Sequence, residues 1–275
     1  MKERIIVAII FVPLLFVIMF FLPPYVFTVV VAAICAISAY ELTGAIGLNK
    51  KRWLSTYAAL AAAFIPIGEH FEIGDPVFQG VLLLLMALIF IEAIAAYKTD
   101  RKIAFSQVLA AVFGGAIIPY MLSALVSLRA MPEGRLFVLL PVISAFLTDA
   151  GAYFVGVLIG KHPAFPNVSP NKTVEGFAGG LVIGTLSMII YGFAIASVTS
   201  YQVNFAALTF CGLAGSLFTE LGDLAFSLVK REYSIKDFGS LLPGHGGVLD
   251  RFDSMVFTAP AIYLLVIILP GITIV

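Results

Sequence analysis

Long apolar runs separated by short polar breaks make up most of the chain. A helix needs about 20 apolar residues to span the hydrocarbon core of a bilayer. We predict nine such spans, at residues 5–22, 25–47, 53–67, 77–97, 103–128, 136–160, 174–198, 203–229 and 254–274. Because backbone groups in lipid must be hydrogen-bonded within their own segment, these runs are expected to be helices rather than barrel strands. The pattern predicts an all-α polytopic integral membrane protein.

The first apolar run has a second interpretation, as a cleaved signal peptide, since Lys2 and Arg4 precede it. Its apolar stretch is longer than the roughly 7–15 residues of a signal peptide, and no small-x-small cleavage site follows it. We therefore expect a retained first span. The two cysteines, Cys35 and Cys211, both lie inside apolar runs and provide no disulfide framework.

Basic residues are distributed unevenly around the predicted spans. With nine spans, the N-terminus and the loops after the second, fourth, sixth and eighth spans share one side of the membrane. Of the 16 Lys and Arg residues, all except Arg129 and Arg135 fall on that side. Such a bias marks the cytoplasmic face. The N-terminus is thus predicted to be cytoplasmic and the C-terminus to lie outside, with the protein in the cell inner (cytoplasmic) membrane.

We divide the chain near residue 135. Residues 1–135 are expected to be transmembrane scaffold helices, and residues 136–275 a catalytic transmembrane region. Two polar loops, at 160–176 and 230–253, interrupt the second region on the predicted cytoplasmic side. Only 12% of the chain is charged, and desolvated charge is costly in a membrane protein, so a concentration of charge favours a functional site. The second loop holds Lys230, Arg231, Glu232, Lys236, Asp237, His245, Asp250, Arg251 and Asp253.

The second loop also contains a glycine-rich turn, Pro243-Gly244-His245-Gly246-Gly247. Glycine permits a tight turn and a close approach of the backbone to a ligand. A glycine-rich turn alone is ordinary loop sterics, but charged residues of both signs flank this one. Its histidine is the one that we expect to have a function.

Acidic residues inside the predicted spans indicate a cation site. Asp223 lies about two helical turns before Lys230, and Ser227 shares their helical face. Clustered carboxylates repel one another unless a cation lies among them. Oxygen ligands suit Mg²⁺, and no Cys/His cluster indicates zinc. One Mg²⁺ is expected, and whether a second cation joins it stays open. The predicted metal ligands are Asp223, Asp250, Asp253 and Asp149.

Two further patterns have plainer interpretations. Glu41 and Glu92 stand alone in early spans and are expected to pack or to hydrogen-bond between helices. Gly176, Gly180 and Gly184 recur at every fourth position, which is a close helix-packing pattern. They mark either an internal seam or the interface of a homodimer, and the sequence does not choose between the two.

Several motifs between about residues 145 and 260 are similar, in order and spacing, to those of one enzyme family. Together they resemble the pattern of phosphatidate cytidylyltransferases, also called CDP-diacylglycerol synthases. Residues 1–135 resemble the family only in being apolar spans. The motifs are Asp149-Ala150-Gly151-Ala152-Tyr153, Gly160-Lys161-His162, Ser169–Gly176, Gly222-Asp223, Ser227–Arg231, Lys236-Asp237, Pro243–Gly247 and Asp250–Asp253.

One position departs from the family pattern. Members usually carry an acid where this chain has Phe226, whereas Glu220 stands at a position that is usually not acidic. The two positions lie one helical turn away from Asp223 on opposite sides. We hypothesise that Glu220 partly compensates for the missing acid.

The resemblance implies the reaction CTP + phosphatidic acid → CDP-diacylglycerol + diphosphate, in phospholipid biosynthesis. The partners are then CTP, phosphatidic acid and membrane lipids, with no nucleic acid. A lipid phosphate is largely ionised near pH 7 because its second pKa is about 6, so catalysis needs positioning and charge neutralisation rather than a base. The candidate catalytic residues are Asp223, Asp250, Lys230, Arg231, Lys236, Asp237, His245 and Arg251. The candidate substrate-binding residues are Ser169, Lys172, Thr173, Ser227, Gly244, Gly246 and Gly247.

Two alternatives remain open. A CTP-dependent polyprenol or dolichol kinase would use similar machinery, but it would release CDP instead of diphosphate. A cation-coupled transporter is the non-enzyme alternative, since buried acids and glycine-broken segments also mark transport sites. Against a transporter, the charge lies in the predicted cytoplasmic loops rather than at the membrane midplane, and no inverted repeat is evident.

Overall fold

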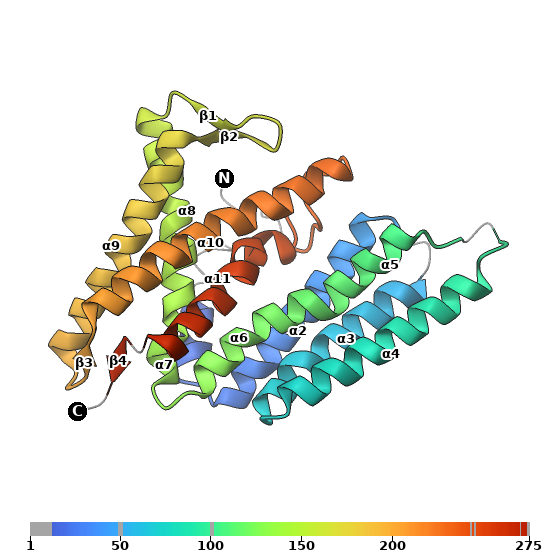
Figure 1. The fold of residues 1–275 in the computed structure, drawn as a ribbon, viewed down its shortest axis with the longest axis horizontal. Helices are drawn as coiled ribbons and strands as arrows, with labels where there is room; N and C mark the ends of the chain where they lie inside the picture. The colour runs from blue at the N-terminus through green and yellow to red at the C-terminus, as the bar shows by residue number, and fades with distance from the viewer. Residues whose placement is uncertain are drawn as a thin grey trace. The chain divides into compact units, whose positions relative to one another are not determined.

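The computed structural model describes residues 13–48, 52–99, 102–242, 244, 246–269 and 271–273. Within these residues, seven helices are long and apolar enough to cross a membrane. They are α2 (Pro24–Ala45), α4 (Gly74–Ala95), α5 to α6 (Phe105–Ala130), α7 to α8 (Gly134–Ile159), α9 (Val174–Val198), α10 (Phe205–Glu232) and α11 (Leu249–Ile268). The prediction of an all-α polytopic membrane protein is confirmed (Figure 1).

The predicted count of nine spans stays a prediction, as do the sides of the two termini. Helix α3 (Arg52–His70) coincides with the third predicted span, but it has Pro66 in its interior and is not among the seven. Of the first predicted span, residues 13–20 are helical, and residues 5–12 lie outside the described residues.

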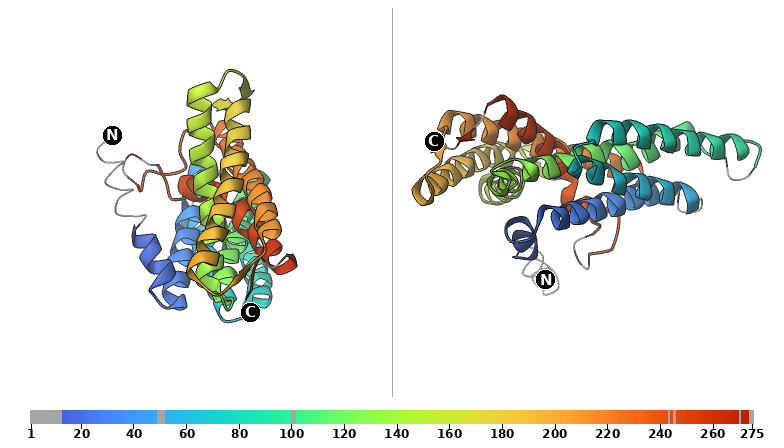
Figure 2. Two further views of the ribbon diagram at one scale, coloured as in Figure 1. Left: turned by 90° about the vertical axis from the view of Figure 1, so that its left-hand side faces the viewer. Right: turned by 90° about the horizontal axis from the view of Figure 1, so that it is seen from below.

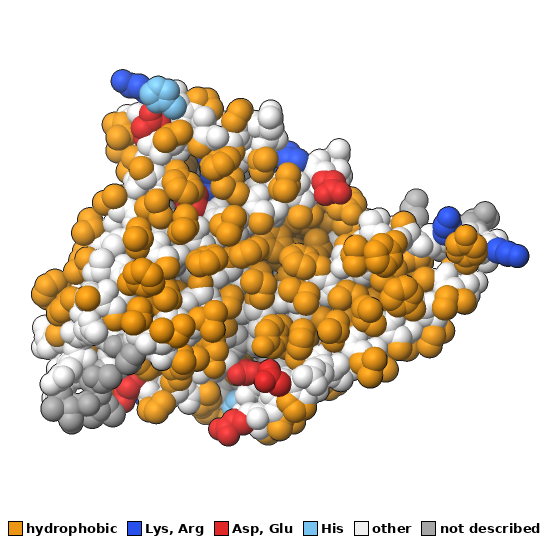
Figure 3. Space-filling model, in the orientation of Figure 1, with side chains coloured by type: hydrophobic (Ala, Val, Ile, Leu, Met, Phe, Trp, Pro, Cys, Tyr) orange, Lys and Arg blue, Asp and Glu red, His pale blue; other side chains and the backbone are white. Residues whose placement is uncertain are grey.

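Large apolar side chains are exposed along the helices. Leu83 and Ile94 of α4 are 73% and 74% exposed, and Leu158 of α8 is 77% exposed. Hydrophobic side chains also cover most of the face seen in Figure 3. Extensive exposed apolar surface marks a region that contacts lipid or a partner rather than water, which agrees with helices that lie in a bilayer.

The chain folds as two compact units. Unit 1 comprises residues 1–132 and 232–252, and unit 2 comprises residues 133–231 and 253–275. The second polar loop therefore groups with the N-terminal helices. The predicted division at residue 135, which concerns scaffold and catalytic roles, stays a prediction.

In unit 1, α3 packs against α2, α4 and α6. One π-helical turn, η2 (Phe113–Ile117), separates α5 (Phe105–Val112) from α6 (Ile118–Ala130). A Cβ on Gly115 of this turn would lie only 2.9 Å from the Cα of Ala58 in α3. Glycine thus lets η2 approach α3 closely, and the helices enclose a core that includes Leu54, Leu85 and Ile89.

In unit 2, α8 (Leu139–Ile159) packs along α9, and an antiparallel hairpin joins them (Figure 2). The hairpin consists of β1 (Pro163–Phe165) and β2 (Ser169–Thr173). The short helix α7 (Gly134–Phe137) precedes α8. A second pair of strands, β3 (Gln202–Val203) and β4 (Ile272–Thr273), joins the start of α10 to the end of the described chain.

The glycine series of α9 forms an internal seam. Gly176, Gly180 and Gly184 are buried. A Cβ on Gly176 would lie 2.8 Å from the carbonyl oxygen of Ala152 in α8, and one on Gly180 would lie 3.1 Å from the Cβ of Ala152. The series thus serves packing within the chain. Whether the protein forms a homodimer stays a prediction.

Helix α11 differs from the ninth predicted span at both ends. The span was predicted at 254–274, whereas the helix begins at Leu249 and ends at Ile268. Asp250 lies in its first turn, where a negative charge is favoured by the helix dipole. At the other end, the sequence Pro270-Gly271 is unfavourable to helix, and Ile272–Thr273 pairs as strand β4 instead.

Candidate active site

Helices α10 and α11 approach closely where two acidic motifs lie. A Cβ on Gly222 would be 2.9 Å from the carbonyl oxygen of Asp253 and 3.0 Å from the Cα of Ser254. Any larger side chain at position 222 would push the helices apart. Glycine at position 222 therefore lets the segment of α10 that carries Asp223 approach Asp253 in α11. This close approach explains why glycine precedes Asp223 in the motif.

Asp149 of α8 joins these two acids. It interacts electrostatically with both Asp223 and Asp253. The hydroxyl of Ser254 lies 3.4 Å from Asp149 Oδ2 and 3.4 Å from Asp253 Oδ1, and so links the two carboxylates. Three of the four predicted metal ligands, Asp149, Asp223 and Asp253, thus lie near one another in unit 2.

Two lysines balance these carboxylates. Lys172 Nζ lies 2.7 Å from Asp223 Oδ2 and also pairs with Glu220, while Lys230 Nζ lies 3.7 Å from Asp253 Oδ2. Burial by itself lowers the pKa of the Lys172 ammonium, but the carboxylates of Asp223 and Glu220 outweigh burial, so its pKa lies above the usual value. Lys172, predicted to bind substrate phosphate, is here a counter-charge to acids.

The chemistry of this cluster fits Mg²⁺. Its donors are carboxylate and hydroxyl oxygens, which are the ligands that hard cations prefer, and Mg²⁺ is commonly held by one or two carboxylates together with substrate phosphate oxygens. Among the described residues, no group of three or more His, Cys, Asp or Glu residues is arranged tightly enough to hold a metal by itself. The assignment of Asp149, Asp223, Asp250 and Asp253 to a cation therefore stays a prediction.

The first motif loop is held by its own side chains and by one side chain of α10. Thr173 caps α9 by accepting the N–H of Gly176 at 3.1 Å, and Ser169 opens β2. Arg231 Nε, at the end of α10, donates to the carbonyl oxygen of Val168 at 3.1 Å. Thr173 and Arg231 were predicted to bind substrate and phosphate, and the contacts seen for them are structural.

In unit 1, the glycine-rich turn adopts the backbone that its sequence predicts. Gly244 and Gly246 have φ angles of +73° and +85°, a region that side chains with a Cβ rarely adopt. The N–H of Leu242 donates to the carbonyl oxygen of Gly246 at 2.9 Å, which closes the turn. His245, the predicted functional histidine, lies outside the described residues.

Asp250 stabilises the same loop. Its Oδ2 accepts the N–H of Phe238 at 2.8 Å and that of Gly247 at 3.0 Å. The carboxylate thus joins the two arms of the loop at the start of α11.

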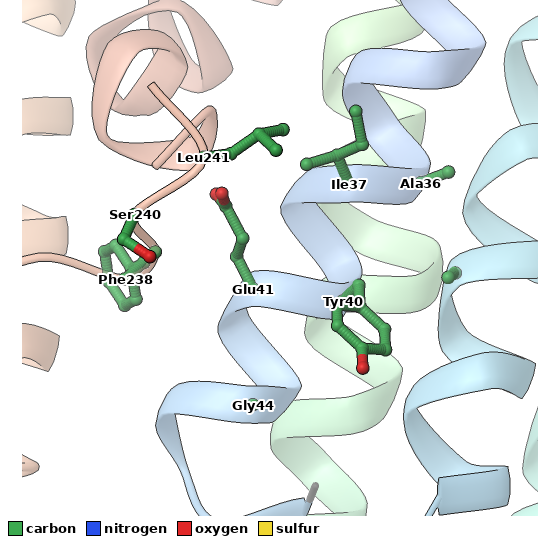
Figure 4. A pocket seen from close by; sticks show the side chains of 10 residues that line it. Ala36, Ile37, Tyr40, Glu41, Gly44, Phe238, Ser240 and Leu241 are labelled. Carbon is green, nitrogen blue, oxygen red and sulfur yellow. The ribbon is translucent and has the colours of Figure 1, made fainter. Parts of the chain in front are cut away.

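Two hollows lined by described residues border this loop and share Gly239 and Ser240. One is a pocket of about 610 Å³ and the other a groove of about 780 Å³ (Figure 4). The pocket places the predicted residues Lys236, Asp237, Gly244, Gly246 and Arg251 around one space. The lining of the groove, mostly apolar, consists of Ala36, Ile37, Tyr40, Glu41, Gly44, Ala59, Phe238, Gly239, Ser240 and Leu241.

Sequence reasoning missed the role of Glu41 in this loop. Glu41 of α2 was expected to pack or to bond between helices, yet its carboxylate accepts the backbone N–H groups of Val248 and Leu249. The two hydrogen bonds span sequence separations of 207 and 208 positions. The one signal for it was the carboxylate itself, alone in an apolar run, because such a group must find donors.

The seven long apolar helices define the class of the protein, a helical membrane protein. Unit 2 holds the cluster of acids and lysines, and unit 1 holds the polar pocket beside the glycine-rich turn. A profile of the cytidylyltransferase family matches residues 2–269. The chain therefore belongs to the cytidylyltransferase family and is a nucleotidyltransferase. The resemblance drawn from the motifs is confirmed.

Several bacterial relatives named phosphatidate cytidylyltransferase are similar to this chain. The protein of Bacillus subtilis (strain 168) is 31% identical over 274 residues, which cover 96% of this chain and 97% of the relative. That of Staphylococcus haemolyticus (strain JCSC1435) is 36% identical over 211 residues, covering 77% and 78%. That of Staphylococcus aureus (strain COL) is 44% identical over 135 residues, covering 49% and 50%.

Proposed function

We propose that the protein is a phosphatidate cytidylyltransferase of phospholipid biosynthesis, which converts CTP and phosphatidic acid into CDP-diacylglycerol and diphosphate. The observation that carries the proposal is its similarity, along 96% of the chain, to the Bacillus subtilis relative of that name. Bacterial relatives and apolar helices also favour the inner membrane. The bias of basic residues favours a site on the cytoplasmic side.

The chain's own residues support charge neutralisation rather than base catalysis. The attacking group is the lipid phosphate, which is largely ionised near pH 7 because its second pKa is about 6. The obstacle is the approach of two polyanions. Lys236 and Arg251, which line the 610 Å³ pocket, would hold phosphate oxygens, and the glycine turn would donate backbone N–H groups.

The acidic cluster of unit 2 has a separate part in the proposal. Asp149, Asp223 and Asp253 would hold Mg²⁺, which when bound supplies positive charge that stabilises the developing charge on the phosphates. Lys172 and Lys230 keep the acids balanced and oriented through the ion pairs described above. Asp250 would hold the loop that carries Arg251.

The test uses the full chain in detergent with phosphatidic acid and two differently labelled samples of CTP. Label at the α-phosphate should appear in the lipid extract, and label at the γ-phosphate should leave as diphosphate. EDTA should abolish turnover and Mg²⁺ should restore it. Asp223→Asn should slow turnover at least about tenfold, equivalent to ~1.4 kcal/mol of transition-state stabilisation.

Other outcomes would contradict the proposal. Transfer of the γ-label to a lipid with release of CDP would identify a lipid kinase. Turnover that is unaffected by EDTA would remove the metal from the mechanism. Incorporation of α-label without phosphatidic acid would mean that another lipid is the acceptor.

A further inference from the structure

Glu41 lies among the N-terminal helices, yet its carboxylate caps a helix of the catalytic motifs. Glu41 Oε1 accepts the N–H of Val248 at 3.0 Å, and Oε2 accepts the N–H of Leu249 at 2.9 Å. The first N–H groups of a helix have no acceptor within that helix, and α11 begins at Leu249. Glu41, which is 9% exposed, therefore supplies acceptors for the start of α11.

Two glycines of the loop pack closely against the same carboxylate. A Cβ on Gly239 would overlap Glu41 Oε1, and a Cβ on Gly247 would overlap Glu41 Oε2. Only hydrogen fits at either position while Glu41 is in place. The carboxylate thus sits between the two arms of the loop, and in Figure 4 it points from α2 toward the segment that carries Ser240 and Leu241.

Glu41 and Asp250 act on one short stretch of backbone. Asp250 Oδ2 accepts the N–H groups of Phe238 and Gly247, and Glu41 accepts those of the next two residues, Val248 and Leu249. Three consecutive N–H groups at the entry to α11 therefore donate to two buried carboxylates. This fixes the direction in which the helix starts, and so the place from which Asp250 and Arg251 project.

We propose that Glu41 is a positioning residue for nucleotidyl transfer. Glu41 caps α11 and packs against Gly239 and Gly247. It thereby keeps Arg251 at the 610 Å³ pocket and keeps Asp250 within hydrogen-bonding distance of the N–H groups of Phe238 and Gly247. The inference rests on the proposed function, because its effect on kcat is measured with CTP and phosphatidic acid. The hydrogen bonds from Val248 and Leu249 to Glu41 can be tested without turnover. A carboxylate that served only the stability of the fold would affect unfolding but not the catalytic step.

The first experiment compares Glu41→Gln with Glu92→Gln, which is the same change to a carboxylate near the C-terminal end of α4. Glutamine keeps the size of the side chain but places a donor against one of the two N–H groups. In hydrogen–deuterium exchange of the full chain, the amides of Val248 and Leu249 should exchange at least about tenfold faster in Glu41→Gln only. Its kcat should fall at least about tenfold, while its unfolding temperature stays close to that of Glu92→Gln.

Two results of this comparison would overturn the proposal. Unchanged exchange at the two amides would mean that the hydrogen bonds do not hold the helix start. A loss of activity that only follows a loss of thermal stability would make Glu41 structural. If the wild-type chain showed no turnover with CTP and phosphatidic acid, the proposed function would fail, while the exchange experiment would still decide the contact.

The second experiment is a double-mutant cycle between Gly239→Ala and Glu41→Ala. The added methyl group collides with the carboxylate, so Gly239→Ala should reduce kcat/KM strongly when Glu41 is present. In the Glu41→Ala background the same change should have little further effect, because the collision is gone. Additive losses would show that the two residues act independently and would overturn the proposal. Failure of Glu41→Gln, Glu41→Ala and Gly239→Ala to fold would assign Glu41 a purely structural role and would also overturn it.

Discussion

At the scale of single residues, one lysine serves two carboxylates inside unit 2. Lys172 pairs with Asp223 and with Glu220, whose side chain is 0% exposed. Phe226, which stands where the family usually has an acid, is 2% exposed and belongs to the apolar interior. The hypothesis that Glu220 compensates for that acid stays a prediction. The lysine that Glu220 shares with Asp223 supports it.

The pairing predicts a specific pattern of stability. Lys172→Met leaves Glu220 buried without a counter-charge, and breaking a buried ion pair in this way costs about 3–5 kcal/mol. Thermal unfolding in detergent should therefore show a marked loss for Lys172→Met and a partial recovery for Lys172→Met combined with Glu220→Gln, since the amide is neutral. Equal losses in the single and double variants would mean that Glu220 does not depend on Lys172.

Sequence reasoning could place the acids but not all of their partners. Helical periodicity set Asp223, Ser227 and Lys230 on one face of a single helix, and α10 is continuous through all three. Lys172 reaches Asp223 from the β1–β2 hairpin, which the sequence indicated only as a polar loop. The bond from Glu41 to Val248 spans 207 positions, and no local pattern encodes such a contact.

At the scale of elements, the glycine series of α9 decides how closely three helices pack. A Cβ on Gly184 would overlap the hydroxyl oxygens of Thr148 in α8 and Ser216 in α10. These two hydroxyls are hydrogen-bonded to each other at 2.8 Å. Gly184 thus lets α9 approach a polar contact between its two neighbours.

This contact predicts a difference between two glycine substitutions. Gly184→Ala should destabilise the protein by about 1–3 kcal/mol through overpacking. Gly80→Ala in α4 is the matched control, because a Cβ there meets nothing within 4 Å, and alanine in a helix is favoured over glycine by about 0.5–1 kcal/mol. Unfolding temperatures should therefore fall for the first variant and hold or rise for the second. An unchanged unfolding temperature for Gly184→Ala would show that the contact of α9 with α8 and α10 can accommodate a methyl group.

Hydropathy located the helices better than it located their ends. The prediction for α9 matches both ends, because Thr173 caps the helix where the apolar run begins. Helix α10 continues three residues beyond the predicted end, to Glu232, since Lys230 and Arg231 are good helix formers and favourable near a C-terminus. The π-helical turn η2 escaped prediction, because its residues, Phe113–Ile117, are as apolar as the helix around them.

At the scale of the whole molecule, charge distribution carries the prediction of topology. Arg129 is one of only two basic residues on the predicted outer side, and it is buried in α6. Its guanidinium donates to the carbonyl oxygens of Met19 and Leu22 at 3.1 and 3.4 Å. An arginine that satisfies backbone carbonyls at the end of a helical segment has a structural reason to be there. It therefore weighs little against the cytoplasmic assignment of the other basic residues.

The orientation can be tested with single cysteines, because the native Cys35 and Cys211 are both buried. Asn171, Ser240 and Glu72 are exposed, in β2, in the second motif loop and after α3. In intact cells, a membrane-impermeant thiol reagent should label Glu72→Cys but neither Asn171→Cys nor Ser240→Cys. In inverted membrane vesicles the pattern should reverse. Labelling of Glu72→Cys and Asn171→Cys from the same face would require an even number of crossings between them, and the nine-span topology, which has three, would be wrong.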